Sequence, residues 1–167
     1  MTQLTISDIP IWLINLPSSV DRFAKMDKQL SEFGLTYTPF EAVNGRAQWE
    51  TLKETVDIPR FERNVGRQVM PGEIGCYHSH LSVWQAFLET DANTALILED
   101  DVIFHDDFCD AVDAALTKFN DWDIVKLNFI RAKFPIEKFR IDDRRCMAYV
   151  GAFTGTGAYL INRSVAR

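Results

Sequence analysis

The sequence predicts an α/β fold in which a mostly parallel sheet is flanked by helices. The chain opens with a strand–helix–strand pattern over residues 9–43, which favours parallel strands joined by a right-handed crossover. Further on, the apolar run Ala95–Leu98 is typical of a strand that is buried on both faces. This run ends in three adjacent carboxylates, and ligands of open α/β sheets bind at the carboxyl ends of the strands.

The opening unit has a signal at each of its boundaries. Ile9–Leu16 is an apolar strand, and Pro17-Ser18-Ser19 breaks it, with either serine suited to cap a helix. Apolar residues then recur at helical spacing from Val20 to Phe33, and Gly34 stands where a helix is expected to end. Leu35–Val43 is the second predicted strand, and a turn signal follows it.

The middle of the chain alternates between irregular and regular segments. Residues 46–70 have no firm period, so we expect a loop with short helices. Pro71-Gly72-Glu73 opens an amphipathic helix that runs to Leu88, and the acidic strand comes next. A helix at Phe108–Phe119 and a strand at Trp122–Asn128 complete this part.

The last part of the chain is less regular. Residues 130–146 are basic and patchy, and we expect them to be mobile. Ala158–Ile161 is a last short strand, and Asn162–Arg167 resembles a helix start with Ser164 as its cap. So short a helix is unstable alone. We therefore expect one domain over residues 1–167 that lacks its C-terminal part, exposes an apolar face beside the last strand, and tends to self-associate.

The composition excludes several classes of protein. A formal net charge of −6 and a pI near 5.0 argue against a nucleic-acid partner. The apolar runs are too short to be transmembrane segments, and Met1–Pro10 does not have the pattern of a secretory signal. The three cysteines, Cys76, Cys109 and Cys146, fit reduced thiols better than a disulfide framework or a zinc site. We expect a cytoplasmic location, free or peripheral at the inner face of the membrane.

The carboxylates Glu99, Asp100 and Asp101 have two interpretations. Their mutual repulsion would be relieved by Mn²⁺ or Mg²⁺, which favour carboxylate oxygens. A solvated acidic turn is the alternative, and the residues alone support both equally. Along a strand Glu99 and Asp101 point to one side and Asp100 to the other. In the metal interpretation Asp101 is the direct ligand, Glu99 acts through water or holds a ribose hydroxyl, and Asp100 turns inward to brace a loop.

A second candidate site lies where the first strand meets the first helix. A strand ending in Asn15-Leu16, a polar turn and a helix N-terminus place backbone N–H groups at the carboxyl edge of the sheet, which suits a nucleotide. Arg22 can pair with a phosphate, and Asp21 can cap the helix or hold Arg22. The alternative is a capped surface helix with solvated charges, and the residues alone favour that alternative.

Five segments, taken together and in this order, resemble glycosyltransferase family 25, which includes bacterial lipopolysaccharide and lipooligosaccharide galactosyltransferases. The segments are Ile14-Asn15-Leu16 with the following serines and Asp21-Arg22; Phe40–Gly45; Gly72–His80 with Trp84; Ala95–Val102; and Gly155–Ile161. The resemblance implies a GT-A-like nucleotide-diphospho-sugar transferase fold that uses a sugar nucleotide and usually a divalent metal. Family members normally continue well past Arg167.

With this resemblance, the donor-binding interpretation of both sites is preferred. The nucleotide-binding candidates are Asn15, Leu16, Ser18, Asp21, Arg22, Glu99 and Asp100. The candidates for holding Mn²⁺ or Mg²⁺ are Asp101 and Glu99. The expected reaction moves a hexose, galactose first among them, from a UDP-sugar to a saccharide or glycolipid acceptor in lipopolysaccharide or related glycan synthesis. Inversion at the anomeric carbon needs a carboxylate as general base, and no residue of the sequence is assigned that role.

The two histidines of the most distinctive segment invite a metal interpretation. His78 and His80 are two residues apart, so on a helix they point to different sides and cannot chelate one ion well. We expect His80 to be buried and to tie the helix to a loop by hydrogen bonds.

Two other functions compete with sugar transfer. A signalling receiver domain also has acidic residues at strand ends, but it carries the acidic pair on its first strand, so we reject it. A non-catalytic nucleotide-sugar binder, or a fragment that folds without turnover, stays open. Turnover assays against a panel of UDP-sugars separate it from an enzyme.

Overall fold

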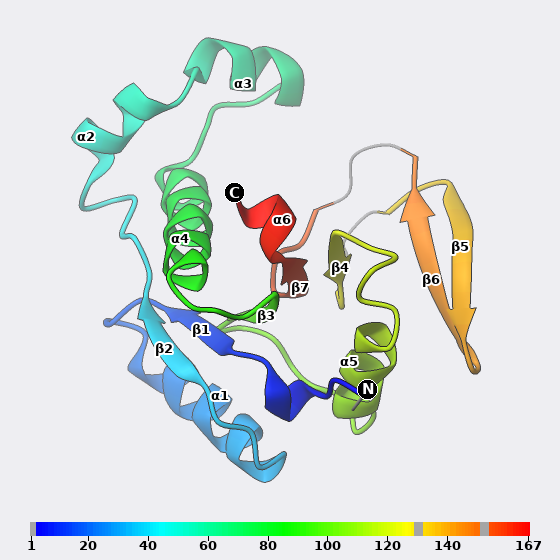
Figure 1. Ribbon diagram of the computed structural model, residues 1–167. Helices are drawn as coiled ribbons and strands as arrows, with labels where there is room; N and C mark the ends of the chain where they lie inside the picture. Colours follow the sequence, from blue (N-terminus) through cyan, green and yellow to red (C-terminus); the bar gives the residue numbers. More distant parts are fainter. Residues whose placement is uncertain (1–2, 129–131, 151–153) are drawn as a thin grey trace.

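The computed structural model describes residues 3–128, 132–150 and 154–167, and within them a five-stranded sheet forms the centre of the molecule (Figure 1). The strand order in this sheet is β2-β1-β3-β7-β4, and a separate hairpin pairs β5 with β6. The strands are β1 (Ile11–Asn15), β2 (Thr38–Glu41), β3 (Thr94–Glu99), β4 (Ile124–Lys126), β5 (Pro135–Ile141), β6 (Arg144–Tyr149) and β7 (Ala158–Asn162).

Helices cover both faces of the sheet (Figure 1). The α-helices are α1 (Val20–Glu32), α2 (Trp49–Leu52), α3 (Ile58–Val65), α4 (Pro71–Leu88), α5 (Phe108–Leu116) and α6 (Arg163–Ala166), with short 3-10 turns η1 (Ile6–Asp8) and η2 (Lys53–Thr55). In the figure α1 and α5 lie on one side of the sheet, and α4 and α6 lie on the other. In the described part of the chain no helix has the length and apolar character needed to cross a bilayer.

The sheet is mixed. Strand β1 runs parallel to both β2 and β3, as the opening strand–helix–strand pattern predicts. Strand β7 is antiparallel to both of its neighbours, β3 and β4. The expected α/β architecture with flanking helices is therefore confirmed, and the antiparallel β7 inserted between β3 and β4 makes the sheet less uniformly parallel than predicted.

Successive side chains of the central strands point to opposite faces of the sheet, and this alternation divides the interior into two cores. In β3, Leu96 and Leu98 pack with residues of α1 and α5, whereas Ala95 and Ile97 pack with residues of α4. All four side chains are fully buried. This confirms the strand buried on both faces. It also fixes which way the residues just beyond Leu98 must point, because the side-chain period of a strand is two.

A close backbone contact brings the loop after β2 against the first turns of α4. A Cβ atom on Gly75 would lie 2.6 Å from the carbonyl oxygen of Val43 and 2.7 Å from the amide nitrogen of Gly45. A Cβ atom on Gly45 would collide with the carbonyl oxygen of Pro71. Both positions therefore require glycine for space, and together they seat residues 42–46 against α4.

The expectation of a mobile segment over residues 130–146 is wrong for most of its described part, because Pro135–Ile141 and Arg144–Tyr149 pair as the β5–β6 hairpin. The turn is formed by Asp142 and Asp143, and Asp142 has a φ of 53°, a conformation that aspartate tolerates better than most residues. Phe139 packs against the core on the α1 and α5 side of the main sheet. The strands contain too many exposed charges to show an alternating apolar pattern.

The chain end also differs from expectation. A one-turn helix, α6, does form over Arg163–Ala166, and its N-cap is Asn162 rather than Ser164. The Arg163 guanidinium donates hydrogen bonds to backbone carbonyls at the end of α4 and just after it, Leu88, Thr90 and Ala92, which holds the turn in place.

Residues Ala158–Ile161 of β7 are buried between β3 and β4. The expected apolar face lies beside this strand rather than on it. Self-association stays a prediction.

We predict that Gly75→Ala destabilises the protein by about 1–3 kcal/mol, because the new methyl group must displace backbone atoms rather than flexible side chains. The matched control is Gly72→Ala in the same helix. A Cβ atom at Gly72 meets nothing within 4 Å, and alanine favours a helix by about 1 kcal/mol over glycine. Urea denaturation measures both variants. Equal stability of the two would show that the contact between α4 and the loop is loose.

Candidate functional site

A cleft of about 280 Å³ opens at the carboxyl ends of β1 and β3. Its lining combines residues that lie far apart in the sequence: Ile14, Asn15, Leu16, Arg22, Ala42, Val43, Asn44, Gly45, Arg46, Gly72, Cys76, Ser79, His80, Glu99, Asp100 and Asp101. The strand ends and α1 form one side, and α4 with the loop after β2 forms the other. This is the position at which open α/β sheets bind ligands.

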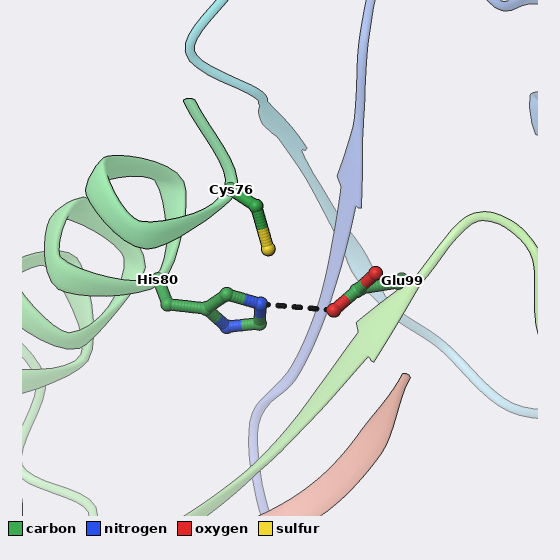
Figure 2. Close-up of side chains that lie close together, drawn as sticks. All are labelled: Cys76, His80 and Glu99. Carbon is green, nitrogen blue, oxygen red and sulfur yellow. Dashed lines mark hydrogen bonds and ion pairs between the residues drawn. The ribbon is translucent and has the colours of Figure 1, made fainter. Parts of the chain in front are cut away.

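Glu99 points toward α4, as its place two residues after Ile97 dictates. Its Oε1 lies 3.0 Å from Nε2 of His80 (Figure 2). The same oxygen also accepts a hydrogen bond from the Thr156 hydroxyl. Burial opposes ionisation of Glu99, but the hydrogen bonds from His80 and Thr156 outweigh it and lower its pKa. The carboxylate is therefore held charged between α4 and the segment before β7.

His80 is buried and completes this connection, as expected. Its Nδ1 lies 2.8 Å from the hydroxyl of Tyr159, which also accepts a hydrogen bond from the indole of Trp84. Burial disfavours the charged imidazole, yet the neighbouring Cys76 and Glu99 side chains together raise its pKa to about 9. The histidine ties the helix to two strands, β3 and β7, rather than to a loop.

His78 faces the other way, as its spacing from His80 predicts. Its Nε2 lies 2.8 Å from the hydroxyl of Thr55, outside the cleft. The pair therefore does not chelate one ion. Between them, Ser79 donates to the carbonyl of Gly75 and accepts from the amide of Val43, which fastens the wall of the cleft.

Asp100 turns to the opposite face, toward β1 and α1. It is 8% exposed, accepts a hydrogen bond of 2.5 Å from the Asn15 amide, and forms an ion pair of 3.0 Å with Arg22. The Arg22 guanidinium also donates to the hydroxyl of Ser19, at the N-cap of α1. Asp100 thus braces the turn between β1 and α1, which is the role expected for it, and it holds Arg22 at the cleft.

Asp101 lies past the end of β3 and lines the cleft. Among the described residues, no ion pair or hydrogen bond to another residue engages its side chain. Partial burial, together with the negative charges of Glu99 and Asp100, raises its pKa. Of the three carboxylates, Asp101 is therefore the one that a cation would stabilise most, and its exposed oxygens fit a hard divalent ion.

Most of the sequence-predicted site residues come together in this cleft. Asn15, Leu16 and Arg22 line it beside the three acidic residues. Ser18 is exposed outside the lining, and Asp21 lies in the first turn of α1 without holding Arg22. Nucleotide contact by these two residues stays a prediction.

Two residues of this site were given no role by sequence reasoning. Thr156 lies in a glycine-rich stretch, and its hydrogen bond to Glu99 depends on the tertiary position of β7. Cys76 precedes His80 by four residues, a spacing that places both on one face of a helix. The spacing of a cysteine and a histidine four residues apart on one helix is the signal in the sequence that points to Cys76.

A second groove, of about 880 Å³, lies between the β5–β6 hairpin and α5 with β4. None of the sequence-predicted donor or metal residues lines it. Arg144 and Arg145 lie here rather than at the cleft, and Arg144 pairs with Asp107. The predicted donor-binding and metal-binding residues therefore favour the smaller cleft as the functional site.

The model of one protein family, described as "Glycosyltransferase family 25 (LPS biosynthesis protein)", matches residues 8–167. The chain belongs to glycosyltransferase family 25. The family resemblance seen in the sequence is thereby confirmed. All five segments that carry it meet at or beside the cleft, since four of them contribute lining residues and the fifth supplies Thr156.

Curated relatives support the same family. A glycosyltransferase 25 family member of Anopheles gambiae is 28% identical over 93% of this chain, and human procollagen galactosyltransferase 2 is 30% identical over 69% of it. A Rattus norvegicus relative, 26% identical over 94% of the chain, is named a probable inactive family member. The chain spans 29%, 20% and 29% of these three proteins, respectively.

We predict that Asp100→Ala lowers the free energy of unfolding by about 1–3 kcal/mol, because it leaves the Asn15 amide and the Arg22 guanidinium without their shared acceptor. Asp101→Ala is the matched control, since it removes the adjacent and exposed carboxylate. It should change stability by less than about 0.5 kcal/mol. Urea denaturation in buffer containing a chelator measures both. A larger loss for Asp101→Ala would reverse the roles given to the two residues.

Proposed function

We propose that this chain transfers a hexose, galactose in the first instance, from a UDP-sugar to a hydroxyl group of a saccharide or glycolipid acceptor. Family membership supports glycosyl transfer, and the names of several relatives support galactose as the sugar. The observation that carries the proposal is the cleft itself. It combines an arginine, a free carboxylate and the start of a helix at the carboxyl edge of the sheet.

The donor diphosphate would lie between Arg22 and Asp101. Arg22 is half exposed, and its ion pair with Asp100 fixes the guanidinium at the cleft while other N–H groups stay available for phosphate oxygens. The N-terminus of the 13-residue helix α1 adds backbone N–H groups and a favourable dipole for the same anion.

Asp101 would hold Mn²⁺ or Mg²⁺, with Glu99 acting through water or on the ribose. The residues fit such an ion, because Asp101 presents exposed carboxylate oxygens and carries a raised pKa beside two negative charges. When bound, a divalent cation supplies neutralisation of the departing diphosphate. We extend the proposal to a single displacement with inversion, within a GT-A-like fold and a lipopolysaccharide or related glycan context.

The prediction for the metal is that UDP binds tightly only with Mn²⁺ or Mg²⁺. Asp101→Ala should remove the metal-dependent part of the affinity and leave the fold intact, because Asp101 is exposed and supports no other side chain among the described residues. Asp106→Ala removes a nearby exposed carboxylate outside the cleft and should leave UDP affinity unchanged. Isothermal calorimetry is the measurement. Equal affinity with and without chelator would refute the metal role.

The prediction for Arg22 is that Arg22→Ala weakens UDP binding by about 1–3 kcal/mol, the value of a charge-assisted contact, or about 5–150-fold in Kd. Lys25→Ala removes one positive charge from the same helix, away from the cleft lining, and is the matched control. Equal Kd values for the two variants would leave Arg22 with only its structural pairing to Asp100.

A non-catalytic sugar-nucleotide binder is the second candidate, favoured by the relative named as a probable inactive family member. Both candidates require UDP binding in the cleft, but only an enzyme consumes the donor. Turnover against a panel of UDP-sugars, with the chain shown by calorimetry to bind UDP, separates them. Binding without turnover of any donor would support the second candidate.

A further inference from the structure

Three side chains of different chemistry meet at the α4 side of the cleft: Cys76, His80 and Glu99. One ligand atom from each lies within 4.8 Å of the other two, and Nε2 of His80 is 3.0 Å from Oε1 of Glu99. Figure 2 shows the thiol and the imidazole projecting from α4 toward the Glu99 carboxylate. The proposed donor chemistry uses neither the thiol nor the imidazole.

The backbone holds these ligands on two well-packed elements. Cys76 and His80 are four residues apart in α4, so they lie on the same face of the helix, about one turn apart. Glu99 is the last residue of β3, which is buried at the centre of the sheet. The cluster is therefore set by rigid secondary structure rather than by a loop.

His80, which is buried, and Glu99, which is half-buried, are each oriented by a further hydrogen bond. Glu99 is ionised and can only accept, so His80 donates its Nε2–H to it, and Nδ1 lies against the hydroxyl of Tyr159. Binding of a metal ion at Nε2 would release that proton to solvent, because a histidine ligand must be deprotonated at the coordinating nitrogen. Thr156 donates to the same Glu99 oxygen. Histidines that bind metals characteristically donate their other ring N–H to a neighbouring oxygen. Tyr159 is placed to accept such a bond.

The kinds of ligand select the metal. Thiolate and imidazole ligands with one carboxylate suit Zn²⁺, whereas Mg²⁺ and Mn²⁺ favour oxygen ligands alone. In a tetrahedral zinc site the ligand atoms are about 3.3–3.6 Å apart, given Zn–S near 2.3 Å and Zn–N near 2.0 Å. The observed spacing, from 3.0 Å to within 4.8 Å, needs only side-chain adjustment to reach these values. A thiolate and a carboxylate also balance the two charges of the ion.

We propose that Cys76, His80 and Glu99 form a three-ligand Zn²⁺ site whose fourth coordination position opens into the cleft. All three residues line the cleft, and Cys76 is exposed, so water or an oxygen of a bound molecule can reach that position. Three protein ligands with one open position is the arrangement of zinc sites that exchange a ligand. This site shares Glu99 with the proposed donor site but does not use Asp101, and it does not depend on sugar transfer.

Cobalt spectroscopy on the full 167-residue chain without a histidine tag tests the proposal. Co²⁺ should bind with one equivalent and give a thiolate-to-cobalt charge-transfer band with intense tetrahedral d–d bands, and Zn²⁺ should displace it. An excess of Mg²⁺ should not, because Mg²⁺ does not favour thiolate. A spectrum without the charge-transfer band would refute the site.

Zinc binding by single-residue variants tests whether the ion lies at this cluster. Cys76→Ser should remove the charge-transfer band and weaken Zn²⁺ binding by at least about 100-fold. Loss of a residue that only hydrogen-bonds to a metal ligand already lowers metal affinity by about 10–100-fold. Cys109→Ser and Cys146→Ser remove thiols outside the cluster and should change neither. Glu99→Gln, checked for folding by circular dichroism, should also weaken Zn²⁺ binding. If Asp101→Ala abolishes Zn²⁺ binding and Cys76→Ser does not, the ion lies at the acidic strand end and the proposal is wrong.

Discussion

Adjacent carboxylates repel one another, and at the end of β3 the protein accommodates Glu99, Asp100 and Asp101 in a row. The period of the strand separates the first two, so that Glu99 meets His80 on one face of the sheet and Asp100 meets Arg22 on the other. Asp101 stays in the cleft without a partner side chain among the described residues. The end of β3 therefore connects α4 to α1 and leaves one carboxylate free for a ligand.

The wall opposite the strand ends depends on a second constraint, which is steric. Gly45 and Gly75 let the loop after β2 approach the backbone of α4 more closely than any other residue would allow. Ser79 then fixes the loop by its hydrogen bond to Val43. The loop and the helix together bound the cleft of about 280 Å³ on this side.

Sequence reasoning predicted the elements that have strong local signals. The unit from β1 to β2 and the buried β3 follow directly from apolar periodicity and from glycine and proline at their ends. Helix α4 is predicted by its opening Pro71-Gly72-Glu73, but its buried face includes Ser79 and His80, whereas Tyr77 and Leu81 of the expected apolar face are exposed. Sequence reasoning also predicted the opposite directions of Glu99 and Asp100, because the strand period alone decides them. It failed for the β5–β6 hairpin, whose exposed and charged strands have no apolar alternation, and for the cap of α6, where Arg163 stabilises the turn through distant carbonyls. Thr156 and Tyr159 join the site only through the antiparallel insertion of β7, which no local pattern encodes.

The central claim is that the free carboxylate of Asp101 and the guanidinium of Arg22 together hold a metal-bound diphosphate in this cleft. Crystals grown with Mn²⁺ and UDP, measured at the manganese absorption edge, test it most directly. We expect an anomalous peak at direct bonding distance from an Asp101 oxygen, with the diphosphate between that ion and Arg22. A nucleotide bound outside the cleft, or manganese bound away from Asp101 with the diphosphate in place, would contradict the claim.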